Sequence, residues 1–158
     1  MIFEYFNPLP QIPGVEAFIL STYHRKEIDR MFRRDFNKPI IPDVVESVIQ
    51  ILGAQQKAGL DAHEIVIPYE KGVILIRAEE KFFVLVIGKH KMDVPLVRLF
   101  LDVTVPQLMA DKKFLKMIKS APGDKYAVIN EFNLDEKETT FLEMLAAEQQ
   151  EKDDGSEN

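Results

Sequence analysis

Residues 64–88, EIVIPYEKGVILIRAEEKFFVLVIG, are the strongest indication of the fold that we expect for this chain. It holds three short apolar segments separated by turns that contain Gly, Glu and Lys, a pattern typical of consecutive strands. The last segment has six apolar residues in a row, 82–87. Because side chains alternate along a strand, three of them point to each face of the sheet. We therefore expect this strand to be central and covered on both faces.

A helix is predicted ahead of this run, over residues 43–58. Pro42 and Asp43 open it, since proline is tolerated in the first turn of a helix, and Gly59 follows its end. One face carries apolar residues at the spacing i, i+3, i+4, i+7. These residues are Val45, Val48, Ile49 and Leu52.

A second helix is predicted after the run, beginning near Asp93 with Pro95 in its first turn. Pro106 is expected to break or kink this helix, and a further helical stretch follows over 111–119. The apolar residues that share a face are Leu96, Leu99, Phe100 and Val103 in the first part, and Phe114, Leu115 and Ile118 in the second.

Two strands are predicted upstream of the first helix. Residues 15–21 have strand composition. The charged segment 24–38 matches neither a helical stripe nor a clean alternation, and we interpret it as an exposed strand that forms a hairpin with the first. Three prolines within residues 8–13 disfavour a regular helix, so residues 1–13 are expected to form an extended lead-in.

The order of elements is therefore strand, strand, helix, three strands and helix. It predicts an α/β (α+β) fold of three layers, a five-stranded, mostly antiparallel sheet with helices on both faces. We assign this fold to residues 14–121. Residues 122–147 are expected to form an appended strand and helix, and residues 148–158 an acidic disordered tail. Asn133 and Glu136 resemble a capping box for the appended helix. Its apolar residues are Phe141, Leu142 and Leu145.

The charge of the chain is concentrated at its end. The chain has 158 residues, 46% hydrophobic and 29% charged, and a formal net charge of −6. Residues 131–158 contain ten acidic and two basic residues, so the preceding 130 residues carry 18 basic and 16 acidic groups. A body this close to neutral argues against a strongly basic nucleic-acid binder. The absence of cysteine excludes disulfides, thiolate nucleophiles and cysteine-ligated zinc.

The order of elements and four segments resemble the roadblock family, which includes dynein light chains and the MglB-type regulators of Ras-like GTPases. The segments are 12–17 (IPGVEA), the helix 43–58, the strands of 64–88 and the helix opening 95–101 (PLVRLFL). The resemblance covers residues 12–104. It implies a profilin-like sheet with the strand order 2-1-5-4-3, and members that act as scaffolds or regulators without catalytic residues.

The resemblance also implies a homodimer or heterodimer, formed by the helix 43–58 and the strand 64–70, on which a small GTPase docks. The helix carries apolar residues off its main stripe, which leaves apolar surface for a partner. Pro68 lies in the strand expected to pair across the dimer and lacks a backbone donor. If its nitrogen faces the partner, a continuous ten-stranded sheet is interrupted there. The candidate dimer-interface residues are Val44, Ile51, Ala54, Ile65 and Ile67.

The segment 25–38 carries six basic side chains against three acidic ones, with Phe32 and Phe36 between them. One interpretation is a solvated hairpin of mixed charge. The others are a surface for an acidic protein partner, for nucleic-acid phosphates or for the chain's own acidic tail. Among these functional interpretations we place protein docking first. The candidate partner-docking residues are Arg25, Lys26, Arg30, Arg33, Arg34 and Lys38.

Catalytic motifs are missing from the sequence. It contains no P-loop, G-x-G-x-x-G, G-x-S-x-G or H-E-x-x-H pattern. Asp61, His63 and Glu64 are clustered, but no second histidine lies nearby in the sequence, so we interpret them as a polar strand entrance rather than a metal site. We predict no catalytic, cofactor-binding or metal-binding residues.

The sequence also predicts where the protein works and what it does. No apolar run approaches the length of about 20 residues that spans a bilayer, and the N-terminus lacks the basic region of a signal peptide. We expect a cytoplasmic, bacterial protein with no membrane insertion. Its predicted function is that of a non-enzymatic dimeric scaffold or regulator that binds a small Ras-like GTPase or another protein. The alternatives are a small-molecule sensing domain on a profilin-like sheet, or weak nucleic-acid binding through residues 25–38.

Overall fold

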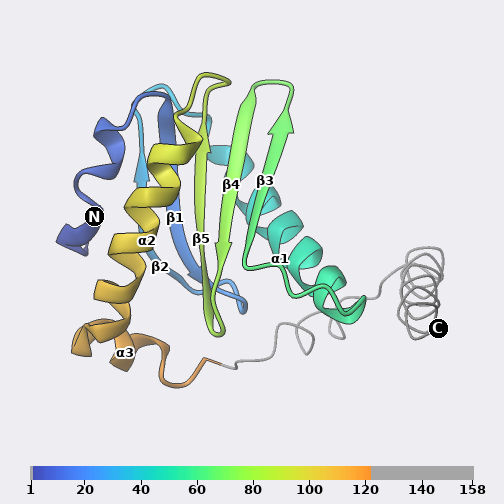
Figure 1. The fold of residues 1–158 in the computed structure, drawn as a ribbon, viewed down its shortest axis with the longest axis vertical. Helices are drawn as coiled ribbons and strands as arrows, with labels where there is room; N and C mark the ends of the chain where they lie inside the picture. Colours follow the sequence, from blue (N-terminus) through green and yellow to red (C-terminus); the bar gives the residue numbers. More distant parts are fainter. Residues whose placement is uncertain (1, 122–158) are drawn as a thin grey trace, which may run out of the picture.

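A five-stranded sheet organises residues 2–121, the part of the chain that the structure, a computed structural model, describes (Figure 1). The strands are β1 (Val15–Thr22), β2 (Glu27–Phe32), β3 (Glu64–Tyr69), β4 (Gly72–Ala78) and β5 (Phe82–Gly88). Their order in the sheet is β2-β1-β5-β4-β3, and every neighbouring pair is antiparallel. The predicted fold class and strand order are confirmed.

Helices cover both faces of the sheet. α1 (Ile41–Lys57) lies behind the sheet in Figure 1, whereas α2 (Val94–Ala110) and α3 (Lys112–Ile118) lie in front of it. A short 3-10 helix, η3 (Lys38–Ile40), leads into α1. No helix in the described part of the chain has the length and apolar character needed to cross a bilayer. The appended elements and the tail that we predict over 122–158 lie outside the described residues.

β5 is the central strand, because β1 and β4 flank it and all seven of its residues are buried. Its apolar side chains divide evenly between the two cores, with Phe82, Val84 and Val86 on the α2 side and Phe83, Leu85 and Ile87 on the α1 side. Burying an apolar side chain of this size contributes about 1.5–3 kcal/mol. The six-residue apolar run therefore stabilises both layers at once.

β1 and β2 form the predicted hairpin, in which Phe18 pairs with Met31. Its turn contains Arg25, whose φ of 62° lies in the left-handed region. A non-glycine residue in this region costs about 1–3 kcal/mol. The turn is closed by the N–H of Lys26, which donates to Oγ1 of Thr22 at 3.2 Å.

The N-terminal residues do not form the extended lead-in that the prolines predicted. They form two 3-10 helices, η1 (Glu4–Phe6) and η2 (Leu9–Gln11). A 3-10 helix has about three residues per turn, so residues at a spacing of three share a face. Proline is compatible with this conformation because its fixed φ suits the first turn. The side chains at this spacing enter the core on the α2 side, and they are Phe3, Phe6, Leu9 and Ile12.

Contacts near both of its ends attach the N-terminal segment to the rest of the fold. The buried carboxylate of Asp29 on β2 accepts hydrogen bonds from the N–H groups of Ile2 (2.9 Å) and Phe3 (3.0 Å). At the other end, Gly14 has a φ of 86°, and a Cβ atom there would lie 2.5 Å from Cα of Met92. Glycine is the residue that tolerates both constraints, which gives the IPG segment its structural role.

Pro106 does not end α2, which continues to Ala110. The proline removes one backbone hydrogen bond, but buried apolar residues of the last two turns hold the helix on the sheet. α3 then follows and packs two residues inward as predicted, Phe114 and Ile118, whereas Leu115 is exposed.

The apolar face that the spacing in α2 identified is the outer one. Of the four residues predicted to share a face, Phe100 packs against the core. Leu96, Leu99 and Val103 have exposed fractions of 40%, 61% and 55%. Because both faces of α2 are apolar, the spacing alone does not distinguish the inner face from the outer one. The buried residues are Val97, Leu101, Thr104, Val105 and Leu108.

Candidate functional site

An apolar groove of about 330 Å³ lies between α1 and the β3 side of the sheet. Water in contact with such walls is unfavourable, so the groove favours cover by another apolar surface. Asp43 and Ser47 are its polar lining residues. The apolar ones are Ile40, Val44, Val48 and Ile51 from η3 and α1, and Ile67, Tyr69, Ile74 and Ile87 from the sheet.

Three of the five predicted dimer-interface residues meet at this groove. Val44 and Ile51 come from one face of α1, two turns apart, and Ile67 faces them from β3. Ile65 and Ala54 lie close by on the same two elements but do not line the groove. All five side chains are half-buried, so each keeps some apolar surface for a partner. Their role in dimerisation stays a prediction.

β3 is an edge strand, and its pairing with β4 shows which backbone groups are free. The N–H of Ala78 donates to the carbonyl of His63 at 2.9 Å, so the backbone of His63 faces β4. Facing alternates along an antiparallel strand, and the register is regular. Glu64, Val66 and Pro68 therefore turn their backbone groups to the free edge. A strand that pairs along the whole of β3 lacks one hydrogen bond at Pro68.

The six predicted partner-docking residues do not form one patch. Arg25 and Lys26 belong to the β1–β2 turn, whereas the three at 33–38 follow the other end of β2. β2 has six residues, which at about 3.3 Å per residue separates the two groups by about 20 Å. Arg30 lies between them, with Nε 3.3 Å from Oε1 of Glu27.

Three of these cations are bonded to other elements of the fold, and one of them, Lys26, donates to the carbonyl of Met117 in α3 at 3.4 Å. Arg25 forms a bidentate pair with Glu46 of α1, with nitrogen–oxygen distances of 2.6 and 3.0 Å. Arg33 donates to the backbone carbonyls of Val15 at 2.6 Å and Pro10 at 2.7 Å. These contacts fix the hairpin to α1 and to the N-terminal segment. A docking role for the segment stays a prediction.

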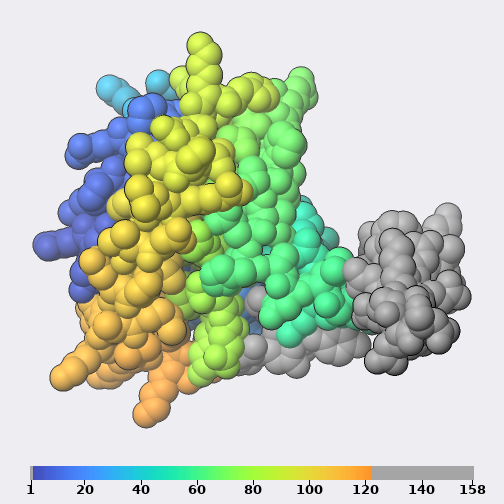
Figure 2. Space-filling view, viewed as in Figure 1, coloured from blue at the N-terminus to red at the C-terminus, as the bar shows by residue number. Residues whose placement is uncertain are grey.

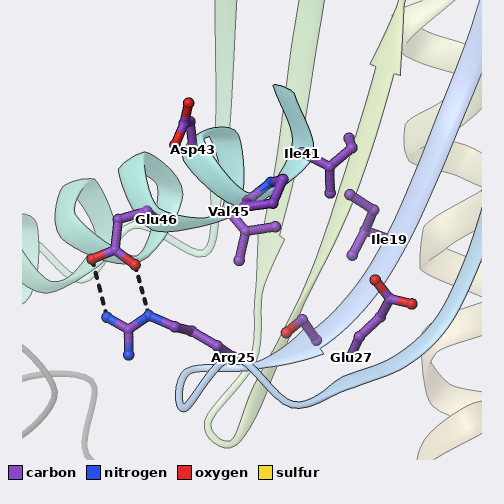
Figure 3. A pocket seen from close by; sticks show the side chains of 9 residues that line it. Ile19, Arg25, Glu27, Ile41, Asp43, Val45 and Glu46 are labelled. Carbon is purple, nitrogen blue, oxygen red and sulfur yellow. Dashed lines mark hydrogen bonds and ion pairs between the residues drawn. The ribbon is translucent and has the colours of Figure 1, made fainter. Parts of the chain in front are cut away.

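A second hollow, of about 420 Å³, lies between the first turns of α1 and the β1–β2 hairpin (Figure 3). The pair formed by Arg25 and Glu46 closes one side, and Glu27 extends from β2 toward the helix, whereas Asp43 points away. The volume is within the range of small-molecule sites, about 300–1,000 Å³. The apolar floor consists of Ile19, Ile41 and Val45.

Sequence reasoning missed a network of four charged side chains that joins β3, β4 and α2. Arg77 is 6% exposed and donates to Oε2 of Glu64 at 2.7 Å and to Oδ1 of Asp102 at 2.8 Å. Glu64 also accepts a hydrogen bond from Arg98. Burial alone would raise the pKa of Glu64, but the hydrogen bonds from Arg98 and Arg77 hold that pKa below its ordinary value. The signal in the sequence was a single arginine within the apolar strand 73–78.

The polar residues at the start of β3 have structural partners. Nε2 of His63 lies 3.5 Å from Oε1 of Glu79, and Glu64 belongs to the charged network. Nearby, the buried hydroxyl of Tyr23 donates to the carbonyl of Phe82 at 3.1 Å, and burial raises the pKa of this tyrosine. Within residues 2–121, no group of three or more His, Cys, Asp or Glu side chains is arranged to hold a metal ion.

Comparisons with known proteins find likeness in structure and none in sequence. No protein-family model matches the chain, and no curated protein matches it. MglB of Myxococcus xanthus superposes with a TM-score of 0.56 at 13% identity, over 70% of this chain and 96% of that one. MglC of Myxococcus xanthus has a TM-score of 0.47 at 17% identity, over 67% and 98%. A Roadblock/LC7 domain from Streptomyces avermitilis has a TM-score of 0.48 at 10% identity, over 65% and 92%.

The likeness to MglB concerns the fold, given the 13% identity. The observed strand order, in which the last strand along the chain is the central one, is the order that the roadblock resemblance implied. The chain therefore has the roadblock fold.

Proposed function

We propose that this protein is a dimeric, non-enzymatic scaffold or regulator that binds a small Ras-like GTPase or another protein partner. The observation that carries the proposal is the apolar groove between α1 and β3. The groove lies on the helix and strand to which the roadblock resemblance assigns dimerisation. Contact between its half-buried apolar side chains and water is unfavourable, so a partner surface that buries them is favoured.

A second copy of the chain is the cover that we propose. In a two-fold dimer each subunit offers the same patch, so Val44 and Ile51 of one α1 meet the corresponding groove of the other. The free edge of β3 offers full backbone pairing at Glu64 and Val66 but lacks a donor at Pro68. The proposed dimer therefore depends more on apolar packing around α1 than on a continuous ladder of backbone hydrogen bonds.

The GTPase part of the proposal is supported by the fold shared with MglB and by the resemblance to MglB-type regulators. The exposed cations Arg34 and Lys38 follow β2, which is the opposite edge of the sheet from β3. A partner that docks at Arg34 and a second copy that docks near β3 would not compete, whereas Lys38 begins η3, whose Ile40 lines the groove. This separation suits a platform that dimerises and binds a partner simultaneously.

The dimer is tested by light scattering coupled to size exclusion on the full-length chain over a dilution series. The expected mass is that of a dimer, and Ile51→Glu is expected to give a monomer, because it places a charge in the groove. Leu60→Glu is the matched control, since Leu60 is 41% exposed and lies outside the groove. A wild-type chain that is monomeric at every concentration would overturn the dimer.

The partner is tested by capture of Ras-like GTPases loaded with GDP or with a non-hydrolysable GTP analogue. Nucleotide-dependent binding that is weakened by the double variant Arg34→Glu, Lys38→Glu is the expected result. If the wild-type dimer binds none of the GTPases tested, the GTPase part of the proposal is rejected, and a dimeric scaffold for another protein remains.

The second hollow favours one alternative function, a small-molecule sensing domain. The ligand would lie between the sheet and α1, on the apolar floor beside the pair formed by Arg25 and Glu46. A small-molecule library screened by thermal shift tests this function, because a ligand that binds the folded state raises the melting temperature. A ligand of the hollow no longer raises the melting temperature of Val45→Phe, which fills the hollow. It still raises that of Ile51→Glu, which alters the groove.

Nucleic-acid binding through residues 25–38 has less support. The basic side chains are split between the two ends of β2, and Arg25 and Arg33 are engaged within the fold. A phosphate-binding footprint needs its cations clustered on one face.

A further inference from the structure

An exposed apolar stripe runs along the outer side of α2 over four turns. A helix that packs one face on a sheet normally presents polar residues on the other, whereas in α2 the exposed polar residues, Arg98, Asp102 and Gln107, only flank this stripe. Leu99 and Val103, in the middle of this face, are 61% and 55% exposed. Such a face favours a cover. At 3.6 residues per turn, the exposed residues that share it are Pro95, Leu96, Leu99, Val103, Pro106 and Ala110.

Exposed lysines continue this surface along α3 and just beyond it. They are Lys112, Lys113, Lys116 and Lys119. In Figure 2, α2 and α3 form one continuous surface toward the viewer. Within residues 2–121, none of these ammonium groups is in an ion pair. Asp111 caps α3 and interacts electrostatically with Lys113, Asp102 is bonded to Arg77, and Glu79 and Glu80 line a hollow with Lys119. The surface therefore combines an exposed apolar stripe with four exposed lysines that form no ion pair within residues 2–121.

The chain itself contains a segment of complementary chemistry. Residues 131–158 contain ten acidic and two basic residues. Within them, Phe141, Leu142 and Leu145 have the spacing of one helical face, as the sequence predicts. Apolar residues bordered by carboxylates complement an apolar stripe bordered by lysines.

The connection has the length to bring the two surfaces together. α2 has 17 residues, so it is about 26 Å long at 1.5 Å per residue. Residues 122–132, when extended, span about 36 Å at about 3.3 Å per residue. Because the segment follows α3 directly in the chain, its effective concentration at α2 is high, which favours it over a separate molecule.

We propose that residues 133–147 dock on the outer face of α2, with their carboxylates near the lysines of α3. Lys26 of the β1–β2 turn donates to the carbonyl of Met117 in α3, so this end of the segment 25–38 borders the lysines of α3, whereas Arg25 and Arg33 already have partners. The contact uses neither the α1–β3 groove nor the β2 edge, so it stands independently of the proposed function.

The contact is tested by methyl NMR on the full-length chain with one nitroxide. Since the chain has no native cysteine, Ala147→Cys provides a single labelling site. The expected result is loss of the methyl signals of Leu96, Leu99 and Val103, with those of Ile51 retained. Leu99→Asp is expected to abolish this effect at Leu96 and Val103. The matched control Leu60→Asp, at another exposed leucine, is expected to leave it unchanged.

Three results would overturn the proposal. The first is that the α2 methyl signals are unaffected by the nitroxide, or that those of Ile51 are lost instead. The second is that the α2 methyl signals are lost only in a mixture of isotope-labelled chains without nitroxide and unlabelled chains with nitroxide. In this mixture the nitroxide and the observed methyl groups are on different chains, so the loss would assign the cover to a second copy. The third is loss of the α2 signals only on addition of phosphatidylserine vesicles, which would make the face a lipid-binding surface.

Discussion

Arg77 of β4 and Glu64 of β3 lie directly opposite each other, and Nε and Nη2 of the arginine donate to the same carboxylate oxygen at 3.2 and 2.7 Å. Nη1 of Arg77 donates to Asp102 of α2 at 2.8 Å. One guanidinium thus connects the edge strand of the sheet to the helix that crosses its face. Because Arg77 is 6% exposed, its positive charge is stabilised by these two carboxylates rather than by water.

Replacing Arg77 with methionine is expected to destabilise the fold by about 3 kcal/mol, because it leaves the carboxylate of Glu64 with half of its charged partners. Arg98→Ala is the comparison, since Arg98 bonds the same carboxylate from an exposed position and its loss should cost about 1 kcal/mol or less. Urea unfolding of the two variants measures both values. Equal losses would show that the burial of Arg77 has no energetic importance.

The same network predicts a pH dependence of stability. The pKa of Glu64 in the folded state lies below its ordinary value of 4.5, so the unfolded chain binds this proton at higher pH than the folded chain does. The stabilisation is complete above pH 4.5 and is lost as the pH falls through the lower, folded pKa. The difference in unfolding free energy between wild type and Glu64→Gln should therefore shrink below this pH. Glu80→Gln, at an exposed glutamate, is the control, and a shrinkage of the same size there would contradict the prediction.

Pro68→Val restores an outward N–H on the free edge of β3. If the dimer pairs along this edge, each restored hydrogen bond contributes about 1 kcal/mol. Two of them, related by symmetry, should tighten self-association roughly thirtyfold, measured by sedimentation equilibrium. Val66→Pro removes a second outward donor and should weaken association. If both variants associate as the wild type does, the β3 edge takes no part in the dimer, even where the groove does.

Asp29→Ala is expected to release the N-terminal segment. The buried carboxylate of Asp29 accepts the N–H groups of Ile2 and Phe3, and its loss leaves Phe3 less firmly packed in its edge-to-face contact with Phe114. The expected cost is about 1–3 kcal/mol for the unsatisfied donors. Hydrogen exchange should then accelerate at the amides of residues 3–12 and remain slow in β5. Unchanged protection of residues 3–12 would show that apolar packing alone holds the segment.

The central sheet was predictable because the patterns that indicate its strands lie within short stretches of the chain. Strands 64–88 alternate or run apolar over lengths typical of strands, and glycine and charged pairs separate them. The hairpin of β1 and β2 was harder to predict, since its charged strand packs only partly on the core. Its burial pattern is irregular, with Ile28 and Asp29 buried next to each other, because Asp29 bonds the N-terminal segment.

The spacing of apolar residues in the N-terminal segment indicated that they are buried, although the prolines argued against a regular helix. Phe3, Phe6, Leu9 and Ile12 recur every third residue, which is the period of a 3-10 helix. Proline excludes the interior of an α-helix but not this conformation. The apolar period, rather than the proline content, was the better guide to whether these residues are buried.

Local sequence patterns were enough to predict the order of the strands and main helices, the central position of β5, the start of α1 to within two residues, and the start of α2 near Asp93. These features depend on periodicity and on residues close together in the chain. Packing between distant segments, by contrast, sets which apolar face of α2 is buried, how the cations of 25–38 are separated, and that Pro68 faces a free edge. Such features depend on contacts between residues far apart in the chain, such as Arg77 with Asp102, which joins β4 to α2, and Ala78 with His63, which fixes the facing of the β3 backbone. Local periodicity does not specify which partner lies across such a contact.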